Sequence, residues 1–593
     1  MADPQYSPRD GQAFDVVLIG GGTGGYVAAI RAAQLGLDAA VIEIDKLGGT
    51  CLHRGCIPTK AFLKSADVYE EVQHSAEFGV DIAGEVAFNY PAALDRSNKV
   101  VNGQYKGLQY LFDKKYKIPV IAGFGSIAGP GQVQVAPAAG GAPFTLATRN
   151  IIIDTGTRPR AIKDLPFDGK RVINSDDAVV LETLPQSFII RGGGAVGVEW
   201  ASIYGRYGST VSLVGRVVPA EDEEAAAVLI RAFKRQGIAV FPASRPTADD
   251  IDVTKSGVRM RLKDDRGKEE VVEAEILLVA IGRQGNVEDI GLEKVGVATE
   301  DGLIPVDAMM QTNVPNIFAI GDVNGQQMLA HTAMHMGVIA IEHIAGHNPY
   351  PLDVLNSPMV TFCRPEIASV GLTEKQAVDQ GRSVKTGKFP MRPNGKAVIE
   401  GETDGFAKVV ADAETNDMLG MTIVGPHATE LIGGLAMGRL LEVTPEEIGI
   451  SVFPHPTVSE VIHEAALDLL GHALHINAPI AGKRQLGQLR GGEPPDLGEV
   501  VSGTWHSDRG SCLVDREDNR FAATGIEPDQ IADDDVKTGL LARHPRRRPL
   551  NGFTALDEAS RKAPLSRLEG AWSALAKQNA TVARYQDRHG ELG

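Results

Sequence analysis

Residues 48–60 read GGTCLHRGCIPTK, and this stretch organises the interpretation of the whole chain. It holds Cys51 and Cys56 in a chain with only 4 cysteines, and it leads into an expected helix over residues 59–72. A helix N-terminus favours the thiolate form of a cysteine, and two thiols this close can close and reopen a short disulfide. The alternative is a pair of buried, inert cysteines. The nucleotide-binding signature before the pair favours redox chemistry.

That signature lies between a strand and a helix. Residues 14–19 form an apolar run typical of a buried parallel strand, and an alanine-rich helix is expected over residues 26–35. A second strand, expected over residues 39–44, carries Glu43 near its end, where an acidic side chain would hold a ribose hydroxyl. The pattern predicts a dinucleotide-binding unit. The glycines that fit GxGxxG are Gly20, Gly22 and Gly25.

The pattern recurs in the middle of the chain. A strand over residues 188–190 is followed by a second glycine signature, a helix over residues 198–207 and a strand over residues 210–214. Two such units predict two dinucleotides, with a tightly held flavin in the first and an exchangeable nicotinamide in the second. The glycines of the second signature are Gly192, Gly194 and Gly197.

The two units differ at the position that contacts the ribose. At the offset that reaches Glu43 in the first unit, the second unit has Gly215, followed by Arg216. A guanidinium in place of a carboxylate suits a ribose 2′-phosphate, which favours NADPH over NADH. The alternative is that Arg216 is a solvated surface charge and that Glu221 or another residue makes the ribose contact.

Composition narrows the class of protein. A length of 593 residues predicts three or four domains, and a net charge of -17 that is spread along the chain argues against a nucleic-acid partner. Four cysteines are too few for a secreted disulfide scaffold. We see no signal peptide and no apolar run long enough for a membrane span. A cytoplasmic enzyme is expected.

His455 has neighbours that suit a proton acceptor. His455 lies between two prolines, and Glu460 is expected to begin a helix from which its carboxylate orients the imidazole. A His–carboxylate pair can take a proton from a thiol and return it. A lone His-Pro pair would more often be a turn, but the thiol pair earlier in the chain favours catalysis.

These features together resemble one family. The thiol stretch, both glycine signatures and residues 453–460 closely resemble the flavoprotein disulfide reductases, and among them the dihydrolipoamide dehydrogenases, from about residue 14 to residue 476. The resemblance implies an α/β fold with two Rossmann-like dinucleotide-binding domains and an α+β dimerisation domain. The implied domains are 1–157 (FAD, first part), 158–284 (NAD(P)), 285–356 (FAD, second part), 357–476 (interface) and 477–593 (a C-terminal extension).

The resemblance also assigns roles. It implies FAD together with NAD or NADP, with Cys51 as the interchange thiol and Cys56 as the charge-transfer thiol. Lys60 would lie near the flavin, paired with Glu199. His455 and its carboxylate partner would act in the other subunit's active site, so a homodimer is expected. Further implied cofactor contacts are Thr155, Gly156, Gly282, Asp322 and Ala330.

The expected reaction is oxidation of protein-bound dihydrolipoamide through the Cys51–Cys56 disulfide and FAD, with reduction of NAD(P)+. The partner would then be a lipoyl-carrying protein or a complex of the 2-oxoacid dehydrogenase type. The alternative is an NADPH-dependent reductase of another disulfide, such as glutathione disulfide. A silent flavoprotein scaffold is a third reading, which the intact thiols and His455 disfavour. No metal site is expected, and Cys363 is interpreted as packed in the core.

Residues 477–593 lie beyond the resemblance. A Gly- and Pro-rich linker begins at residue 477. A mixed polar stretch with Trp505 and Cys512 follows, and then an expected helix over residues 565–585 with one apolar face. That face could dock on its own dimer or on a larger complex, or remain undocked, and the sequence does not separate these alternatives.

Overall fold

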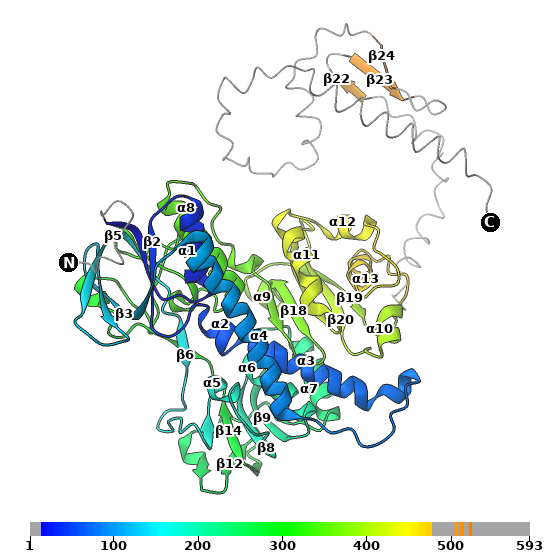
Figure 1. The fold of residues 1–593 in the computed structure, drawn as a ribbon. Coiled ribbons are helices and arrows are strands. Elements are labelled where there is room, and N and C mark those ends of the chain that lie inside the picture. The colour runs from blue at the N-terminus through cyan, green and yellow to red at the C-terminus, as the bar shows by residue number, and fades with distance from the viewer. Residues whose placement is uncertain (1–12, 477–504, 508–509, 515–520, 525–593) are drawn as a thin grey trace, which may run out of the picture. The chain divides into compact units, whose positions relative to one another are not determined.

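The computed structural model describes residues 13–476 and three strands beyond them, at residues 505–507, 510–514 and 521–524 (Figure 1). The chain divides into two compact parts, Met1–Gln485 and Leu486–Gly593. In the C-terminal part, β22 (Trp505–Ser507), β23 (Gly510–Val514) and β24 (Phe521–Thr524) pair as an antiparallel sheet where the sequence predicted only a polar stretch. The expected linker and the helix over residues 565–585 lie outside the described residues.

The first sheet carries the first glycine signature. Its parallel part has the strand order β3-β2-β1-β5-β16, and β4 joins β3 and β5 as an antiparallel meander. Alternate side chains of the central strand enter two different apolar cores, which is why its sequence is continuously apolar. The strands are β1 (Phe14–Ile19), β2 (Ala39–Glu43), β3 (Val120–Gly129), β4 (Gln132–Pro137), β5 (Phe144–Ile153) and β16 (Ile317–Ala319).

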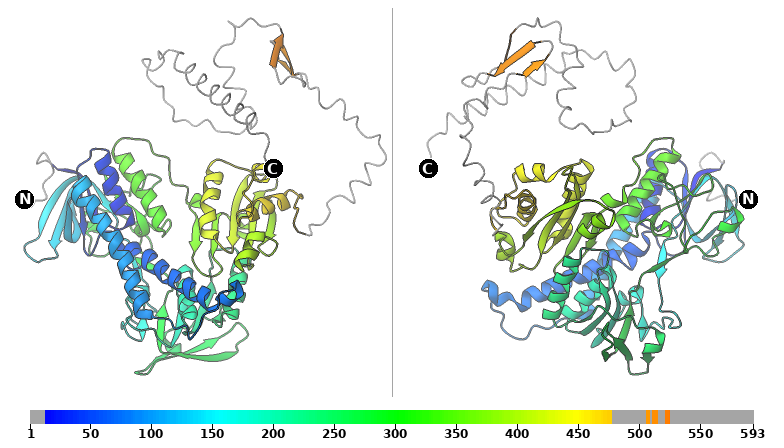
Figure 2. Two further views of the ribbon diagram at one scale, coloured as in Figure 1. Left: turned by 45° about the vertical axis from the view of Figure 1, so that its right-hand side comes forward. Right: turned by 180° about the vertical axis from the view of Figure 1, so that it is seen from behind.

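Helices cover one face of this sheet. The two views of Figure 2 show α1 (Thr23–Gln34) and α8 (Ala330–Ile344) side by side, although they are far apart in the sequence. Small residues on α1, among them Ala28, Ala29 and Ala32, are fully buried and allow the close contact. The helix α4 (Tyr90–Tyr110) adds its apolar side to the same core. The glycine signature is therefore held on a rigid base.

The second sheet is fully parallel, in the order β10-β9-β8-β14-β7. The sequence predicted a strand that ends at Val214, but β9 extends to Val217, so Gly215 and Arg216 lie inside it. The register between β8 and β9 shifts between Arg191 and Gly193, which accommodates the extra length. The strands are β7 (Val172–Ile173), β8 (Ser187–Gly193), β9 (Thr210–Val217), β10 (Ala239–Phe241) and β14 (Ile276–Val279).

The third sheet is antiparallel, in the order β17-β18-β21-β20-β19, with α11 (Ala428–Leu440) and α13 (Glu460–Leu469) packed against it. The two parallel sheets and this α+β unit confirm the expected fold class. The strands are β17 (Met359–Thr361), β18 (Ile367–Gly371), β19 (Val384–Pro390), β20 (Phe406–Asp412) and β21 (Met418–Val424).

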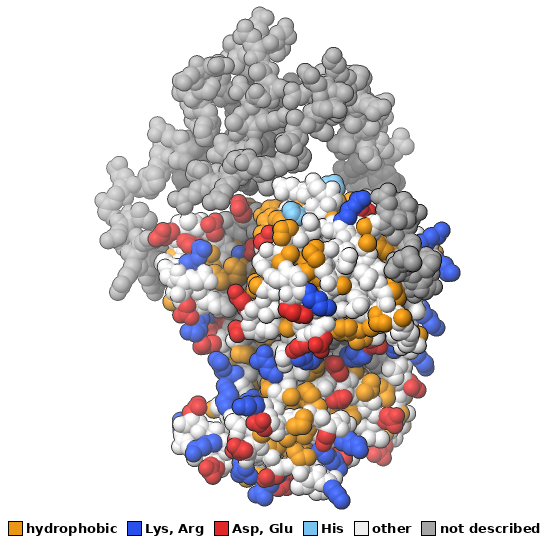
Figure 3. Space-filling model, turned by 90° about the vertical axis from the view of Figure 1, so that its left-hand side faces the viewer, with side chains coloured by type: hydrophobic (Ala, Val, Ile, Leu, Met, Phe, Trp, Pro, Cys, Tyr) orange, Lys and Arg blue, Asp and Glu red, His pale blue; other side chains and the backbone are white. Residues whose placement is uncertain are grey.

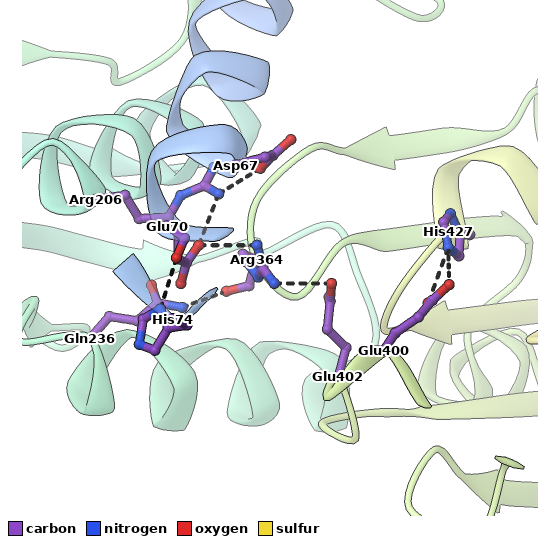
Figure 4. A network of polar contacts seen from close by, with 9 residues as sticks. All are labelled: Asp67, Glu70, His74, Arg206, Gln236, Arg364, Glu400, Glu402 and His427. Carbon is purple, nitrogen blue, oxygen red and sulfur yellow. Dashed lines mark hydrogen bonds and ion pairs between the residues drawn. The ribbon is translucent and has the colours of Figure 1, made fainter. Parts of the chain in front are cut away.

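A polar network fixes the long helix α3 (Cys56–Gln73), which starts at the second thiol (Figure 4). Arg206, whose side chain is 5% exposed, donates to Asp67 (2.6 Å) and to Glu70 (3.3 Å) near the far end of the helix. Glu70 also accepts from Arg364 (3.0 Å), which donates in turn to Glu402 (3.0 Å). These contacts tie α3 to the second and third sheets, so the thiol at its start has a fixed position.

The described surface carries charges of both signs. On the face in Figure 3, acidic and basic side chains are interspersed among apolar ones. None of the helices in the described residues has the length and apolar character needed to cross a membrane.

Candidate active site

The two predicted thiols lie together at a break between two helices. Cys51 belongs to α2 (Gly49–His53), and Cys56 is the first residue of α3. Both are free thiols, and the hydrogen bond between them raises the pKa of Cys51 and lowers the pKa of Cys56 to about 7. Cys56 therefore holds much of the negative charge of the pair near neutral pH.

An ion pair lies one helical turn beyond Cys56. The ammonium of Lys60 lies 2.9 Å and 2.8 Å from the two carboxylate oxygens of Glu199, a residue of α6 (Ala195–Arg206) that is 5% exposed. The backbone N–H of Phe362 donates to the same carboxylate, and the Lys60 ammonium lies 4.5 Å from the centre of the Phe362 ring. The sequence predicted the Lys60–Glu199 pair but gave no indication of Phe362, which reaches the site from the third sheet.

The first glycine loop has the geometry that FAD requires. Gly20 has a φ of +106°, and a Cβ there would lie 2.2 Å from the carbonyl oxygen of Asp154. The N-cap of α1 is Gly22, which has no capping side chain, so the helix N-terminus suits a diphosphate. Glu43 ends β2 and accepts from the N–H of Gly21 at 2.7 Å, so its carboxylate lies directly beside the loop. These residues fit FAD.

A buried carboxyl beneath this loop was missed by the sequence analysis. Asp154 is 7% exposed, and its Oδ2 accepts from the N–H of Gly25 at 2.7 Å. Burial raises the pKa of Asp154 well above its usual value, and the nearby charges of Asp322 and Glu43 add to the shift. The available signal was an acidic residue directly before Thr155 in an otherwise apolar run. Asp154 holds the loop in place.

The next predicted contacts lie where the chain crosses to the second sheet. Thr155 donates through its hydroxyl to the carbonyl of Asn286 at 2.7 Å, and Gly156 has a φ of +65° in the turn that follows β5. The hydroxyl of Thr157 in β6 (Thr157–Pro159) donates to Asp322 at 2.8 Å. The structure thus brings Asp322 to the crossing, beside the first sheet.

Two other residues that were predicted to contact the cofactors lie at the start of a helix and in a turn between two strands. Ala330 is the first residue of α8, and Gly282 lies in a turn with a φ of +119°, between β14 and β15 (Arg283–Gly285). Arg283 makes hydrogen bonds with the hydroxyl and the carbonyl of Thr157, at 2.5 Å and 2.8 Å. Its Nε also lies 3.7 Å from a carboxylate oxygen of Asp322.

A cavity of about 450 Å³ lies over the second glycine loop. Gly194 is the N-cap of α6 and has no capping side chain, and a Cβ on Gly197 would lie 1.8 Å from the carbonyl oxygen of Gly192. Gly215 and Arg216 both line the cavity. These residues fit a nicotinamide dinucleotide.

The alternative was an exposed Arg216 with the ribose contact made by Glu221 or another residue; Arg216 is exposed, but Glu221 is not at the cavity. Glu221 does not line the cavity, and its carboxyl lies beside Ser369 of the third sheet. Burial raises the pKa of Glu221 to about 7. The side chain therefore belongs to the contact between the second and third sheets.

The predicted proton acceptor is assembled at the start of α13. His455 Nδ1 lies 2.9 Å from Glu460 Oε1, and the N–H of Thr457 donates to Glu460 Oε2 at 2.9 Å. The imidazole is exposed, with 76% of its side-chain surface open. Figure 1 shows α13, which begins five residues after His455, separated from α2, the helix that carries Cys51.

Other reactive side chains in the described part of the chain have structural contacts. Cys363 is buried and donates to the carbonyl of Pro365 at 3.0 Å, which confirms that it is packed. His331 pairs with the carbonyl of Pro358 at 2.9 Å. The described residues contain no group of three or more His, Cys, Asp or Glu side chains placed to hold a metal ion.

Comparisons with known proteins agree with this architecture. Residues 14–337 match the family described as pyridine nucleotide-disulphide oxidoreductase, and residues 357–466 match the dimerisation domain of that family. Among curated relatives, a dihydrolipoyl dehydrogenase of Bacillus subtilis (strain 168) is 46% identical over 472 residues, which is 78% of this chain and 99% of the relative. A dihydrolipoyl dehydrogenase of Zymomonas mobilis is 42% identical over 466 residues, 78% of this chain and 99% of the relative.

A solved structure has the same arrangement. The crystal structure of LpdA from Mycobacterium tuberculosis superposes with a TM-score of 0.69 at 28% sequence identity, covering 76% of this chain and 98% of that one. The family match covers both glycine signatures, the thiol pair and, through the dimerisation domain, His455 and Glu460. This chain therefore belongs to the pyridine nucleotide-disulphide oxidoreductase family.

Proposed function

We propose that this protein is a dihydrolipoyl dehydrogenase, which oxidises protein-bound dihydrolipoamide and reduces NAD(P)+. The observation that carries the proposal is the thiol pair at the start of α3, in which Cys56 has a pKa lowered to about 7. Relatives named dihydrolipoyl dehydrogenase support the choice of substrate. The GETDGF stretch at residues 401–406 and the CIPTK ending of the thiol stretch support it as well.

The dithiol chemistry follows from the difference between the two cysteines. A substrate thiolate attacks Cys51 Sγ in the oxidised pair, the Cys51–Cys56 bond breaks, and Cys56 leaves as the thiolate that its lowered pKa favours. The second substrate thiol then attacks the mixed disulfide, the oxidised lipoyl ring leaves, and Cys51 takes a proton. The substrate dithiol loses two electrons, and the protein disulfide gains them.

The other residues handle protons and charge. Of the two substrate thiol protons, one passes through Nε2 of His455, which Glu460 holds through Nδ1, to Cys51 as that sulfur leaves, and the other stays on the imidazole. Lys60 places a positive charge beside the Cys56 thiolate and is itself balanced by Glu199. When bound, FAD and the nicotinamide supply the route by which the electron pair leaves the dithiol as a hydride equivalent.

The working unit of this proposal is a homodimer. Because α13 and α2 are far apart in one protomer, His455 serves the thiols of a second copy. An exposed apolar surface on the α+β part that carries α13 supports self-association, since isolated domains rarely leave so many large apolar side chains in water. Its members are Met437, Leu440, Leu441, Ile450 and Val452, which is 98% exposed.

The partner of the dimer is proposed to be a lipoyl-carrying protein of a 2-oxoacid dehydrogenase-type complex. Reversible dithiol chemistry is suited to the reducing cytoplasm, which we propose as the compartment. The competing function is an NADPH-dependent reductase of another disulfide, such as glutathione disulfide. One observation favours it: Arg216, which follows Gly215, lines the cavity over the second glycine loop.

The test is the rate of dihydrolipoamide oxidation by the purified flavin-loaded enzyme, with NAD and NADP in parallel. Cys51→Ser should lower kcat by at least about 1000-fold, because it removes the sulfur that is attacked. Cys363→Ser makes the same chemical change at a buried thiol outside the site and should leave kcat within about twofold. Full turnover by Cys51→Ser would overturn the mechanism, and NADPH-driven reduction of glutathione disulfide without lipoamide activity would establish the competing function.

A further inference from the structure

The cavity over the second glycine loop carries an excess of positive charge. Its described lining contains four arginines and no acidic side chain. One of them, Arg283, is engaged by Thr157 and Asp322, as described above. The three others, Arg191, Arg216 and Arg245, have no carboxylate beside them in this lining. Three guanidinium groups around one cavity make a site for a multiply charged anion.

Arg191 occupies the place where an acidic side chain would project from β9. A Cβ built on Gly215 would lie 3.3 Å from Arg191 Nη1, so the guanidinium fills the space beside the glycine. Arg191 Nε is buried and has no hydrogen-bond partner. A buried donor without a partner is costly, which indicates a ligand that completes its hydrogen bonds.

Arg245 approaches from the loop after β10. Its Nη1 donates to the carbonyls of Pro242 and Ser244, both at 2.8 Å, so the guanidinium is anchored before any ligand arrives. Arg191 and Arg245 line the same cavity, and burial together with the charge of Arg245 lowers the pKa of Arg191. Such a pair gains free energy when a dianion enters between or beside them.

We propose that Arg191, Arg216 and Arg245 form a clamp for the 2′-phosphate of NADP(H), which makes this enzyme selective for the phosphorylated cofactor. The end of the second strand of such a unit lies at the adenosine ribose, which is where Gly215 is found. The inference rests on the nicotinamide site of the proposed function but requires nothing of the dithiol substrate. The cofactor diphosphate is a second source of the same anion chemistry.

The probes are 2′,5′-ADP, which carries the 2′-phosphate, and ADP, which carries only a 5′-diphosphate. Titration calorimetry on the flavin-loaded enzyme should show that 2′,5′-ADP binds at least about tenfold more tightly than ADP. Arg191→Met and Arg245→Met should each weaken 2′,5′-ADP by about 10- to 100-fold and change ADP by less than about threefold. Flavin content and Tm report whether each variant is folded.

The matched control is Arg259→Met, which removes an exposed guanidinium from β12 (Val258–Lys263) in the same domain, outside the cavity. It should leave both affinities unchanged. Equal losses of 2′,5′-ADP and ADP in the Arg191 and Arg245 variants would assign the arginines to the diphosphate and overturn the clamp. A wild-type enzyme that binds ADP more tightly would also overturn it. Calorimetry reads cofactor binding alone, so absence of lipoamide oxidation would count against the proposed function and not against the clamp.

Substitution of Gly215 is a poor test of this clamp. Gly215 has a φ of +132°, a conformation that other residues rarely adopt, and any side chain there would meet Arg191. Gly215→Glu would therefore combine backbone strain with an ion pair to Arg191. The arginine variants avoid both effects.

Discussion

The two glycine-rich units have the same backbone plan and opposite charges at the ribose end. In the first unit, Glu43 ends the second strand and accepts from the N–H of Gly21. In the second unit, the corresponding position is Gly215, and the space beside it holds the guanidinium of Arg191. A glycine signature of this kind suits a diphosphate, and the side chain at the end of the second strand sets the preference for the ribose, so this difference bears on the proposed cofactor of the second unit.

A second difference lies beneath the loops. The first glycine of each signature packs against a carbonyl, that of Asp154 for Gly20 and that of Ala280 for Gly192, so Asp154 and Ala280 are equivalent positions. In the first unit, the side chain at this position holds the N–H of Gly25. In the second unit, a methyl group cannot do so. The first loop is therefore braced from below, as suits a cofactor that stays bound, and the second is left open to an exchangeable one.

The largest effect should come from adding a methyl group to one glycine of each loop, in separate variants. A Cβ on Gly197 would lie 1.8 Å from the carbonyl oxygen of Gly192, and one on Gly25 would lie 2.4 Å from that of Gly20. Gly197→Ala should lower kcat/KM for the nicotinamide by about 100-fold with flavin retained, because the helix must move away from the loop. Gly25→Ala should instead lose flavin, measured by absorbance per protein.

The control for both variants is Gly107→Ala, in α4, where a Cβ would meet nothing within 4 Å. It should keep both cofactors and be slightly more stable than the wild type. If Gly197→Ala and Gly25→Ala lost the two cofactors in the same proportion, the units would not be independent and the comparison between them would fail.

An intermediate effect should come from the ion pair that joins the two units. Lys60 belongs to the flavin side and Glu199 to α6 of the second unit. The charge of Lys60 lowers the pKa of Cys56, and the charge of Glu199 raises it. Lys60→Met should therefore raise this pKa from about 7 by about one unit, and Glu199→Gln should lower it by a smaller amount.

The pH dependence of iodoacetamide alkylation of the reduced enzyme measures this pKa. Cys363 should contribute little, because it is buried and burial raises its pKa. A Cys363→Ser/Cys512→Ser background leaves Cys51 and Cys56 as the only thiols, and the raised pKa of Cys51 separates it from Cys56. Shifts in the same direction for both variants would show that Lys60 and Glu199 act on Cys56 through a rearrangement and not through their charges.

Much of the site could be predicted from the sequence because its signals are local. The glycine signatures, the two thiols and the His455–Glu460 pair each occupy a short run of residues whose types and order indicate the chemistry. The boundaries were less accurate. Helix α3 begins at Cys56 and not at residue 59, and β9 continues past Gly215, because a register shift against β8 extends the strand.

The side chains that were missed depend on tertiary contacts. Asp154 reaches Gly25 only because β5 lies beside β1 in the sheet. Arg191 precedes the second signature and was visible in the sequence, but its place beside Gly215 follows from the pairing of β8 with β9. Arg245 joins it because β10 pairs with β9 at the sheet edge. No local pattern records these neighbours.

The smallest expected effect concerns Asp154, the side chain that braces the first loop. Its raised folded pKa means that the native state binds a proton that the unfolded chain has released. The free energy of unfolding therefore falls as the pH rises from the unfolded pKa near 3.8 towards the higher folded value. Asp154→Asn keeps an oxygen that can accept from Gly25 and removes this titration. The variant should be as stable as the wild type near pH 4 and more stable than it at pH 8.

Thermal unfolding of the flavin-loaded enzyme between pH 4 and pH 8 measures the difference. The matched control is Asp168→Asn, at an exposed carboxylate whose pKa is lowered by backbone N–H groups. Its lowered pKa gives the opposite sign, because the ionised form contributes stability that is lost as the pH falls. If Asp154→Asn were less stable than the wild type at pH 8, the carboxylate would be ionised and bound in the native state, and the first loop would be held by charge.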